Sequence, residues 1–258
     1  MKMSSKISVV VCGMDSRSRL WPAFKHGFDK YWPDCPWPKY FITNRLEGPS
    51  GFTTIRTGVE VSWGDKTIVA LSQIQSELIL WMMEDFWLPG MVQNKALTDF
   101  YKIMMKHNNI DHIRLMPPCM STEIITPEKE LTGPSEFDNR LWYFKDDAEY
   151  RASVTASFWR RDALLSYIKD YMDPWKFEQE ASIMSMFRKT LYLCIVDPFI
   201  FPIPHYTNPY QQYKNEMVSK GTWNVESAYE YIKKENLTMD FSRHPDGTRN
   251  ELFPYMRR

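Results

Sequence analysis

Two adjacent carboxylates, Glu84 and Asp85, follow directly after six apolar residues, Leu78 to Met83. Such a run is typical of a strand that is buried on both faces of a parallel sheet. Open α/β sheets bind ligands just beyond the carboxyl ends of their strands. Two buried carboxylates need compensating positive charge, and their hard oxygen atoms suit Mg²⁺ or Mn²⁺. The pattern therefore favours a divalent cation that carries a phosphorylated substrate. The alternative is an exposed turn whose acids face water.

A third acid is placed by a predicted helix that begins at Asp173-Pro174. Asp caps free backbone N–H groups, and Pro suits the first helical position. At about 100° per residue, Trp175 and Glu178 share one face of this helix, whereas Glu180 points roughly the opposite way. Only one of the two acids can therefore readily face a cleft, and Glu178 is favoured because it lies beside Trp175 near the start of the helix. The alternative is an ordinary first-turn acid that stabilises the helix dipole.

The overall composition is that of a globular protein. Of the 258 residues, 43% are hydrophobic and 15% aromatic, and 32 basic residues balance 32 acidic ones. The absence of a basic excess argues against a general nucleic-acid binder. No apolar run reaches the ~18 residues of a membrane span, the N-terminus lacks a signal-peptide core, and the four cysteines are scattered. We expect a cytoplasmic protein.

Apolar runs and helical spacing alternate along the chain. Strands are predicted at 7–12, 40–43, 53–57, 78–83, 113–116, 141–144, 152–158 and 191–196. Helices are predicted at 20–31, 65–75, 97–104, 162–168, 174–188 and 226–234, and 117–139 reads as a polar loop. This alternation predicts a single α/β domain over 1–258, with a mostly parallel central sheet flanked by helices.

Several segments together resemble bacterial glycosyltransferases of the GT-A type, particularly the sugar-nucleotide-dependent enzymes of capsule and lipopolysaccharide biosynthesis. The matching segments are Trp32-Pro-Asp-Cys-Pro36, Thr43-Asn44, Ser62-Trp-Gly-Asp-Lys66, 80–88, Ser157-Phe-Trp-Arg-Arg-Asp162, Pro174-Trp-Lys-Phe-Glu-Gln-Glu180 and Lys220-Gly-Thr-Trp223. The resemblance covers most of 7–235. It implies a GT-A-like, Rossmann-like fold with a nucleotide-sugar-binding half at about 1–116 and an acceptor-binding half at about 117–258. Glu84-Asp85 departs from the usual Asp-x-Asp of this fold.

The resemblance implies transfer of a sugar from a nucleotide-sugar donor to a glycan or lipid-linked acceptor, with at most peripheral association with the inner face of the membrane. Charge develops on the departing diphosphate, and the acceptor hydroxyl needs a base. Asp85 would face the metal, Glu178 would be the base of an inverting displacement, and Trp159 and Trp175 would contact the acceptor. The expected donor-binding residues are Asp15, Ser16, Arg17, Asn44, Trp63, Asp65, Lys66 and Glu84.

A rival motif lies in residues 12–22, which partly resemble the glycine-rich loop of sugar-phosphate nucleotidyltransferases. The glycines of that loop let the backbone approach a triphosphate closely. Here only Gly13 remains, and Asp15 and Arg17 stand where bare backbone is wanted. A sugar-phosphate nucleotidyltransferase is the alternative enzyme. A non-catalytic nucleotide- or carbohydrate-binding protein is the third possibility.

Overall fold

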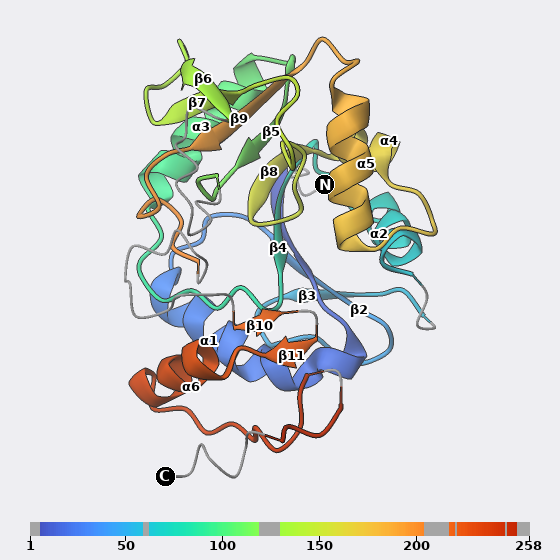
Figure 1. The fold of residues 1–258 in the computed structure, drawn as a ribbon, viewed down its shortest axis with the longest axis vertical. Helices are drawn as coiled ribbons and strands as arrows, with labels where there is room; N and C mark the ends of the chain where they lie inside the picture. The colour runs from blue at the N-terminus through green and yellow to red at the C-terminus, as the bar shows by residue number, and fades with distance from the viewer. Residues whose placement is uncertain are drawn as a thin grey trace, which may run out of the picture.

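The computed structural model describes residues 6–58, 62–118, 130–203, 217–219, 221–245 and 247–251. In these ranges nine strands form one sheet in the order β3-β2-β1-β4-β8-β5-β9-β7-β6 (Figure 1). The strands are β1 (Ile7–Cys12), β2 (Lys39–Thr43), β3 (Thr53–Arg56), β4 (Leu78–Met83), β5 (Ile110–Arg114), β6 (Leu131–Pro134), β7 (Leu141–Phe144), β8 (Ser157–Arg160) and β9 (Leu191–Ile195). A separate antiparallel hairpin pairs β10 (Val218–Ser219) with β11 (Thr222–Trp223).

Seven of these nine strands point in the same direction. Strands β3, β2, β1 and β4 are mutually parallel, and β5 is parallel to β9. In this sheet β8 and β7 point in the opposite direction and pair antiparallel with the strands beside them. The predicted mostly parallel sheet in a single α/β domain is therefore confirmed. Because β8 lies between β4 and β5, one sheet spans both halves of the chain.

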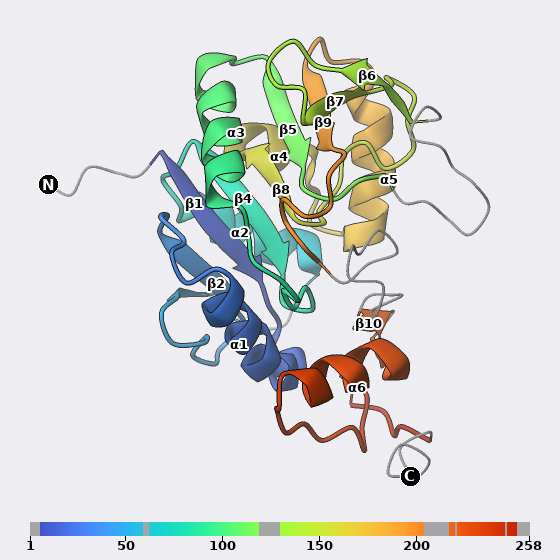
Figure 2. The same cartoon turned by 90° about the vertical axis from the view of Figure 1, so that its left-hand side faces the viewer.

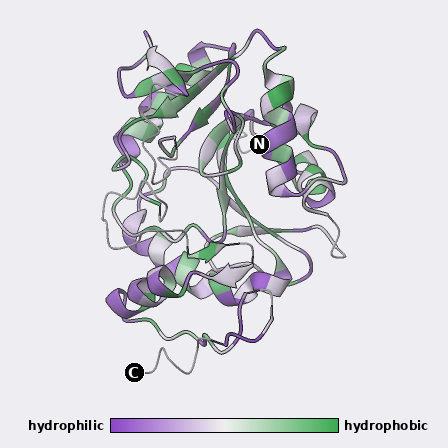
Figure 3. Ribbon diagram, in the orientation of Figure 1, coloured by the Kyte–Doolittle hydropathy of each residue, from purple (hydrophilic) through white to green (hydrophobic). Residues whose placement is uncertain are grey.

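The helices form a layer on each face of the sheet. Their bounds are η1 (Asp15–Leu20, a 3₁₀ helix), α1 (Trp21–Tyr31), α2 (Trp63–Ser72), α3 (Asn94–Lys106), α4 (Arg161–Tyr167), α5 (Pro174–Ser185) and α6 (Val225–Lys234). Helices α1, α3 and α6 pack into one apolar core, and α2, α4 and α5 into the other (Figure 2). Apolar residues dominate the central strands, while polar residues gather on the outer helix surfaces (Figure 3). This arrangement follows from burial of apolar surface on both faces of the sheet.

Two predictions in the middle of the chain are corrected. The strand predicted at 152–158 begins only at Ser157, because backbone groups of the preceding residues bond to side chains of α5 instead of a strand. Ala152 N–H donates to Ser182 Oγ at 3.1 Å, and Val154 N–H donates to Glu178 Oε1 at 2.9 Å. The predicted loop 117–139 contains the edge strand β6, whose short and partly polar sequence lacks a clear hydrophobic alternation. Residues 119–129 of that loop, and Lys220, lie outside the described residues.

The start of α5 agrees with the sequence signal. Asp173 has extended backbone angles, and its Oδ1 accepts from the N–H of Lys176 at 2.8 Å. This bond satisfies one of the free N–H groups of the first turn. The helix ends at Ser185, three residues earlier than predicted.

The described helices are short compared with a bilayer. The longest, α3, has 13 residues, whereas a membrane-spanning helix needs about 20. None of the helices within the described ranges is long and apolar enough to cross a membrane.

Candidate functional site

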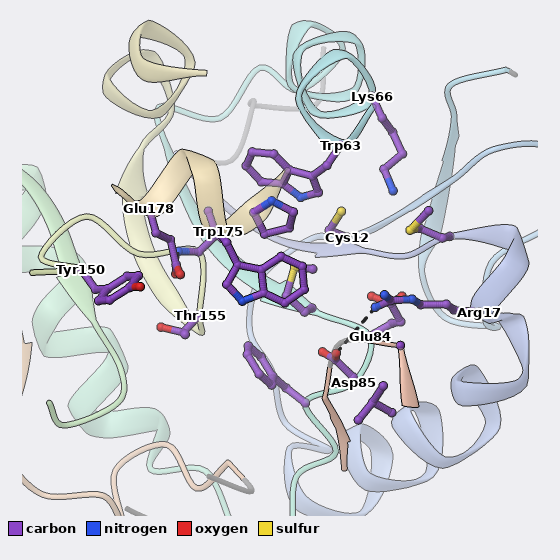
Figure 4. A pocket seen from close by; sticks show the side chains of 17 residues that line it. Cys12, Arg17, Trp63, Lys66, Glu84, Asp85, Tyr150, Thr155, Trp175 and Glu178 are labelled. Carbon is purple, nitrogen blue, oxygen red and sulfur yellow. Dashed lines mark hydrogen bonds and ion pairs between the residues drawn. The ribbon is translucent and has the colours of Figure 1, made fainter. Parts of the chain in front are cut away.

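A cavity of about 410 Å³ opens at the carboxyl ends of β1 and β4 (Figure 4). The N-terminal half contributes Cys12, Met14, Arg17, Trp63, Lys66, Met83, Glu84, Asp85 and Phe86 to its lining. The C-terminal half contributes Tyr150, Val154, Thr155, Pro174, Trp175, Glu178, Val218 and Gly221. The acid pair and Glu178, which are far apart in the sequence, therefore face the same cavity. An edge of this kind is where open α/β sheets bind ligands.

Glu84 is the most deeply buried acid of the cavity. Its residue exposure is 1%, and among the described residues neither carboxylate oxygen has a hydrogen-bond partner. Burial, followed by the neighbouring charge of Asp85, raises the pKa of Glu84 to about 7, although Arg17 and Lys66 partly oppose the rise. A buried carboxylate without a partner is energetically unfavourable. Glu84 is therefore a group that a bound ligand would stabilise.

Two cations stand beside the acid pair. Arg17 Nη1 lies 3.9 Å from Asp85 Oδ2, an ion pair drawn in Figure 4. Lys66 is only 1% exposed, and its Nζ donates to the carbonyl oxygen of Gly13 at 3.0 Å. Ser62 caps the start of α2 by accepting from the N–H of Asp65, which sets the helical turn that carries Lys66. The local charges are thus close to balanced, with positive groups available to an anionic ligand.

The acid pair has the composition that a hard divalent cation requires. In the part of the chain that the structure describes, no group of three or more His, Cys, Asp or Glu side chains could hold a metal ion. A cation would therefore depend on Glu84 and Asp85, with substrate phosphates and water completing its shell. Mg²⁺ commonly binds in this way, through one or two carboxylates plus phosphate oxygens. The buried oxygens of Glu84 fit this role, as does the side chain of Asp85, which lines the same cavity.

Glu178 is held by the segment before β8. Its Oε1 accepts from Ser153 Oγ at 2.6 Å and from the N–H of Val154 at 2.9 Å. Burial raises the pKa of Glu178, and these hydrogen bonds oppose part of the rise. Figure 4 shows the carboxylate directed into the cavity. Glu180 is not among the lining residues; it accepts from Tyr171 Oη at 3.1 Å instead.

Of the expected donor-binding residues, Arg17, Trp63, Lys66 and Glu84 line the cavity, whereas Asp15, Ser16, Asn44 and Asp65 do not. Asp15 accepts from three backbone N–H groups, those of Asn44, Arg45 and Leu46, at 2.8–3.1 Å. In return, Asn44 Oδ1 accepts from the N–H of Asp15 at 3.1 Å. Both carboxylate oxygens of Asp15 are thus occupied. This exchange positions the loops after β1 and β2 beside the cavity.

The expectation that Trp159 contacts an acceptor is corrected by its burial. Trp159 lies in β8 with 0% exposure, and its indole N–H donates to the carbonyl of Ser153 at 3.0 Å. Its ring packs against His112, with ring centroids 4.3 Å apart, and against Phe177. Trp175, by contrast, is 51% exposed and lines the cavity. Trp159 is buried because helices cover both faces of the sheet. A side chain of a central strand such as β8 is therefore buried whichever face it points to.

This difference predicts a large contrast in stability between two matched substitutions. Trp159→Ala should lower the free energy of unfolding by about 3–5 kcal/mol, because it leaves a large cavity in the core. Trp175→Ala should change it by about 0.5 kcal/mol or less, as is usual for surface positions. Urea unfolding monitored by circular dichroism measures both. Equal effects of the two substitutions would contradict the assignment of Trp159 to the core.

Sequence reasoning missed Tyr150, Thr155, Val218 and Gly221 as lining residues. Gly221 belongs to the segment Lys220-Gly-Thr-Trp223, which carries part of the resemblance, whereas Tyr150, Thr155 and Val218 belong to no recognisable motif. The capping signal of α5 fixed the position of Glu178, and the residues that hydrogen-bond to it could only be found from the structure.

Comparison with known proteins gives a fold but no family. No protein-family model and no curated protein matches the sequence. Among solved structures, a UDP-glucose pyrophosphorylase complexed with UDP-glucose superposes with a TM-score of 0.52 at 10% identity, covering 90% of this chain and 97% of the other. S. aureus TarS, residues 1–349, has a TM-score of 0.45 at 14% identity, covering 75% of this chain. Mannosyltransferase PcManGT from Pyrobaculum calidifontis, in complex with GDP-Man and Mn²⁺, has a TM-score of 0.46 at 11% identity, covering 77% of this chain and 56% of the other.

The chain spans 61% of the length of the TarS structure. At 10% identity the similarity to the pyrophosphorylase supports the fold alone, an α/β domain with a large, mostly parallel central sheet. It leaves the reaction open, because one fold serves many activities.

Proposed function

We propose that this protein is a glycosyltransferase that transfers a sugar from a nucleotide-sugar donor to a glycan or lipid-linked acceptor in surface polysaccharide assembly. The observation that supports it best is the shared cavity. On one side stand the acid pair Glu84-Asp85 and the cations Arg17 and Lys66, and on the other Glu178 beside Trp175. A phosphorylated donor and a hydroxyl-bearing acceptor would need these two kinds of surroundings next to each other.

In the proposed reaction the acceptor oxygen forms a bond to the anomeric carbon of the donor sugar. Glu178 takes the proton of that hydroxyl, and the bond between the anomeric carbon and the diphosphate oxygen breaks. The nucleoside diphosphate leaves with the electron pair. Attack and departure on opposite sides of the carbon invert its configuration.

The departing diphosphate requires positive charge close to where its own charge develops. Glu84 and Asp85 would hold a divalent cation, which would supply part of that charge when bound. Arg17 lines the cavity at the same place and can donate hydrogen bonds to phosphate oxygens. Lys66 would have to exchange its bond to the Gly13 carbonyl for one to phosphate.

The main alternative is a sugar-phosphate nucleotidyltransferase. The UDP-glucose pyrophosphorylase whose fold this chain shares catalyses a reaction of that class. Such an enzyme needs backbone N–H groups open to a triphosphate after the first strand. In this chain η1 occupies that position, with Asp15 bonded to the neighbouring loop. Gly13 is required for a packing reason, because a Cβ there would overlap the ring of Phe41. The loop therefore gives the alternative little support.

Incubation with UDP-, GDP- and dTDP-sugars in Mg²⁺ or Mn²⁺ tests the proposal. Slow release of nucleoside diphosphate, with water as the acceptor, is the expected result. Pyrophosphate formation from a nucleoside triphosphate and a sugar phosphate would instead identify a nucleotidyltransferase. Stabilisation by nucleotides in a thermal shift assay without any turnover would identify a binding protein.

A further inference from the structure

Tyr150 has an unusual backbone conformation for an aromatic residue. Its φ is +56°, in the left-handed region. Asn236, which follows the end of α6, is the other described non-glycine residue with a positive φ. Asparagine is often found in this conformation after a helix, whereas a bulky aromatic residue there carries a free-energy penalty. Such strain persists only where the surrounding structure enforces it, and it gathers at functional sites.

Two buried arginines enforce the conformation. Arg114 Nη1 donates to the carbonyl oxygen of Tyr150 at 3.2 Å. On the other side of that peptide unit, Arg151 Nη1 donates to the carbonyl oxygen of Asp146 at 2.7 Å, and its guanidinium lies 4.5 Å from the ring centroid of Tyr192. Both guanidinium groups are withdrawn from solvent, at 4% and 1% side-chain exposure. The backbone around Tyr150 is therefore braced on both sides.

The same segment is tied to the helix that carries the proposed base. Ser182 Oγ accepts from the N–H of Ala152, and Glu178 accepts from Ser153 and Val154. Because these bonds begin two residues after Tyr150, a shift of the segment that holds Glu178 would also shift Tyr150. A change at Arg114 or Ser182 would be expected to move both.

The result of this bracing is an aromatic side chain facing the cavity. Tyr150 and Trp175 both line it, and in the view of Figure 4 the Glu178 carboxylate lies between their rings, with Thr155 beside it. A pyranose has apolar C–H faces that pack on aromatic rings and hydroxyls that bond to carboxylates and hydroxyl groups. Binding sites commonly combine apolar walls with a few placed polar groups in this way.

We propose that Tyr150 and Trp175 are the two walls of a subsite for a pyranose ring of the acceptor, which present one of its hydroxyls to Glu178. This inference rests on the proposed function and adds the acceptor class to it. It also gives a role to the strained tyrosine of this loop, whose ring lines the cavity.

The test uses substitutions that separate the ring from the strained backbone. Tyr150→Phe keeps the ring, Tyr150→Gly removes both ring and strain, and Tyr150→Asn removes the ring with a residue that tolerates positive φ. Asn236→Gly makes the same backbone change away from the cavity and is the matched control. The probes are the methyl pyranosides of glucose, galactose, mannose and N-acetylglucosamine, titrated by saturation-transfer NMR.

At least one of these pyranosides should bind the unaltered protein. Its affinity should fall roughly tenfold in Tyr150→Gly, Tyr150→Asn and Trp175→Ala, as expected for the loss of an aromatic contact and its buried area. Tyr150→Phe and Asn236→Gly should bind as the unaltered protein does. The inference is overturned if none of the four pyranosides binds, or if binding is insensitive to removal of the Tyr150 ring.

Nucleotide-sugar turnover, measured on the same samples, separates this inference from the proposed function. Release of nucleoside diphosphate together with pyranoside binding that ignores Tyr150 would remove the subsite and leave the glycosyltransferase. Pyranoside binding that depends on Tyr150, without any donor turnover, would keep the subsite and remove the glycosyltransferase.

Discussion

Glu178→Gln should lower the rate of sugar transfer by about 10²–10⁴-fold, the usual contribution of general-base catalysis. Glutamine keeps the size of the side chain and can still accept from Ser153 and the Val154 N–H, so the surrounding loop should stay in place. The substitution removes only the ability to take a proton. Nucleotide affinity, measured by titration with the nucleoside diphosphate, should therefore be nearly unchanged.

Glu180→Gln is the matched control on the same helix. Glu180 bonds to Tyr171 and lies outside the cavity lining, so its substitution should have little effect on turnover. The reverse ranking would mean that Glu180, on the opposite face of α5, is the base. Equal and small effects would place the base elsewhere, such as in the segment 138–147, or indicate a mechanism that retains configuration. A product with retained anomeric configuration would reject the single displacement directly.

The pH dependence of activity is a second test of the role of Glu178. A general base must be ionised, so activity should fall as the pH drops through the pKa of Glu178. Burial raises that pKa above its ordinary value, so the fall should begin at a higher pH than for an exposed glutamate. In Glu178→Gln this limb of the profile should disappear.

Glu84→Gln should make the metal-free protein more stable at neutral and alkaline pH. The pKa of Glu84 is raised from 4.5 to about 7, so the folded protein holds this proton more tightly than the unfolded chain. The protonated Glu84 therefore stabilises the folded protein relative to the ionised form. This contribution is fully present below about pH 4.5 and is lost as the pH rises towards 7. Above that range the neutral glutamine should raise the free energy of unfolding by about 3 kcal/mol.

When metal and nucleotide are added, the unaltered protein should become more stable than Glu84→Gln. Mg²⁺ or Mn²⁺ with a nucleoside diphosphate should stabilise the unaltered protein in a thermal shift assay, and this stabilisation should be much smaller in Glu84→Gln and in Asp85→Asn. Both substitutions keep the shape of the side chain and remove its charge. If turnover persists in EDTA and donor binding is unchanged in both variants, the acid pair does not hold a metal. Arg17 and Lys66 would then have to neutralise the diphosphate alone.

Local sequence signals were sufficient for the elements that carry the main acids. The apolar run Leu78 to Met83 specified β4 to the residue, and Asp173-Pro174 specified the start of α5. Helical spacing also predicted that Glu178 and Glu180 would point in different directions. These features depend on a residue and its near neighbours in the chain, so the sequence contains all the information that they need.

Other features depend on contacts between distant segments, and only the tertiary structure decided them. The insertion of β8 between β4 and β5 buries Trp159, which resembled a cleft residue in the sequence. Likewise, Glu84 is 1% exposed whereas the side chain of Asp85 is 17% exposed, and this difference between adjacent acids depends on the segments that pack around the end of β4. Tyr150, whose ring lines the cavity, is held at its carbonyl by Arg114, 36 residues earlier in the chain. Burial and backbone strain are set by the whole fold, because each depends on neighbours that folding brings from elsewhere in the chain.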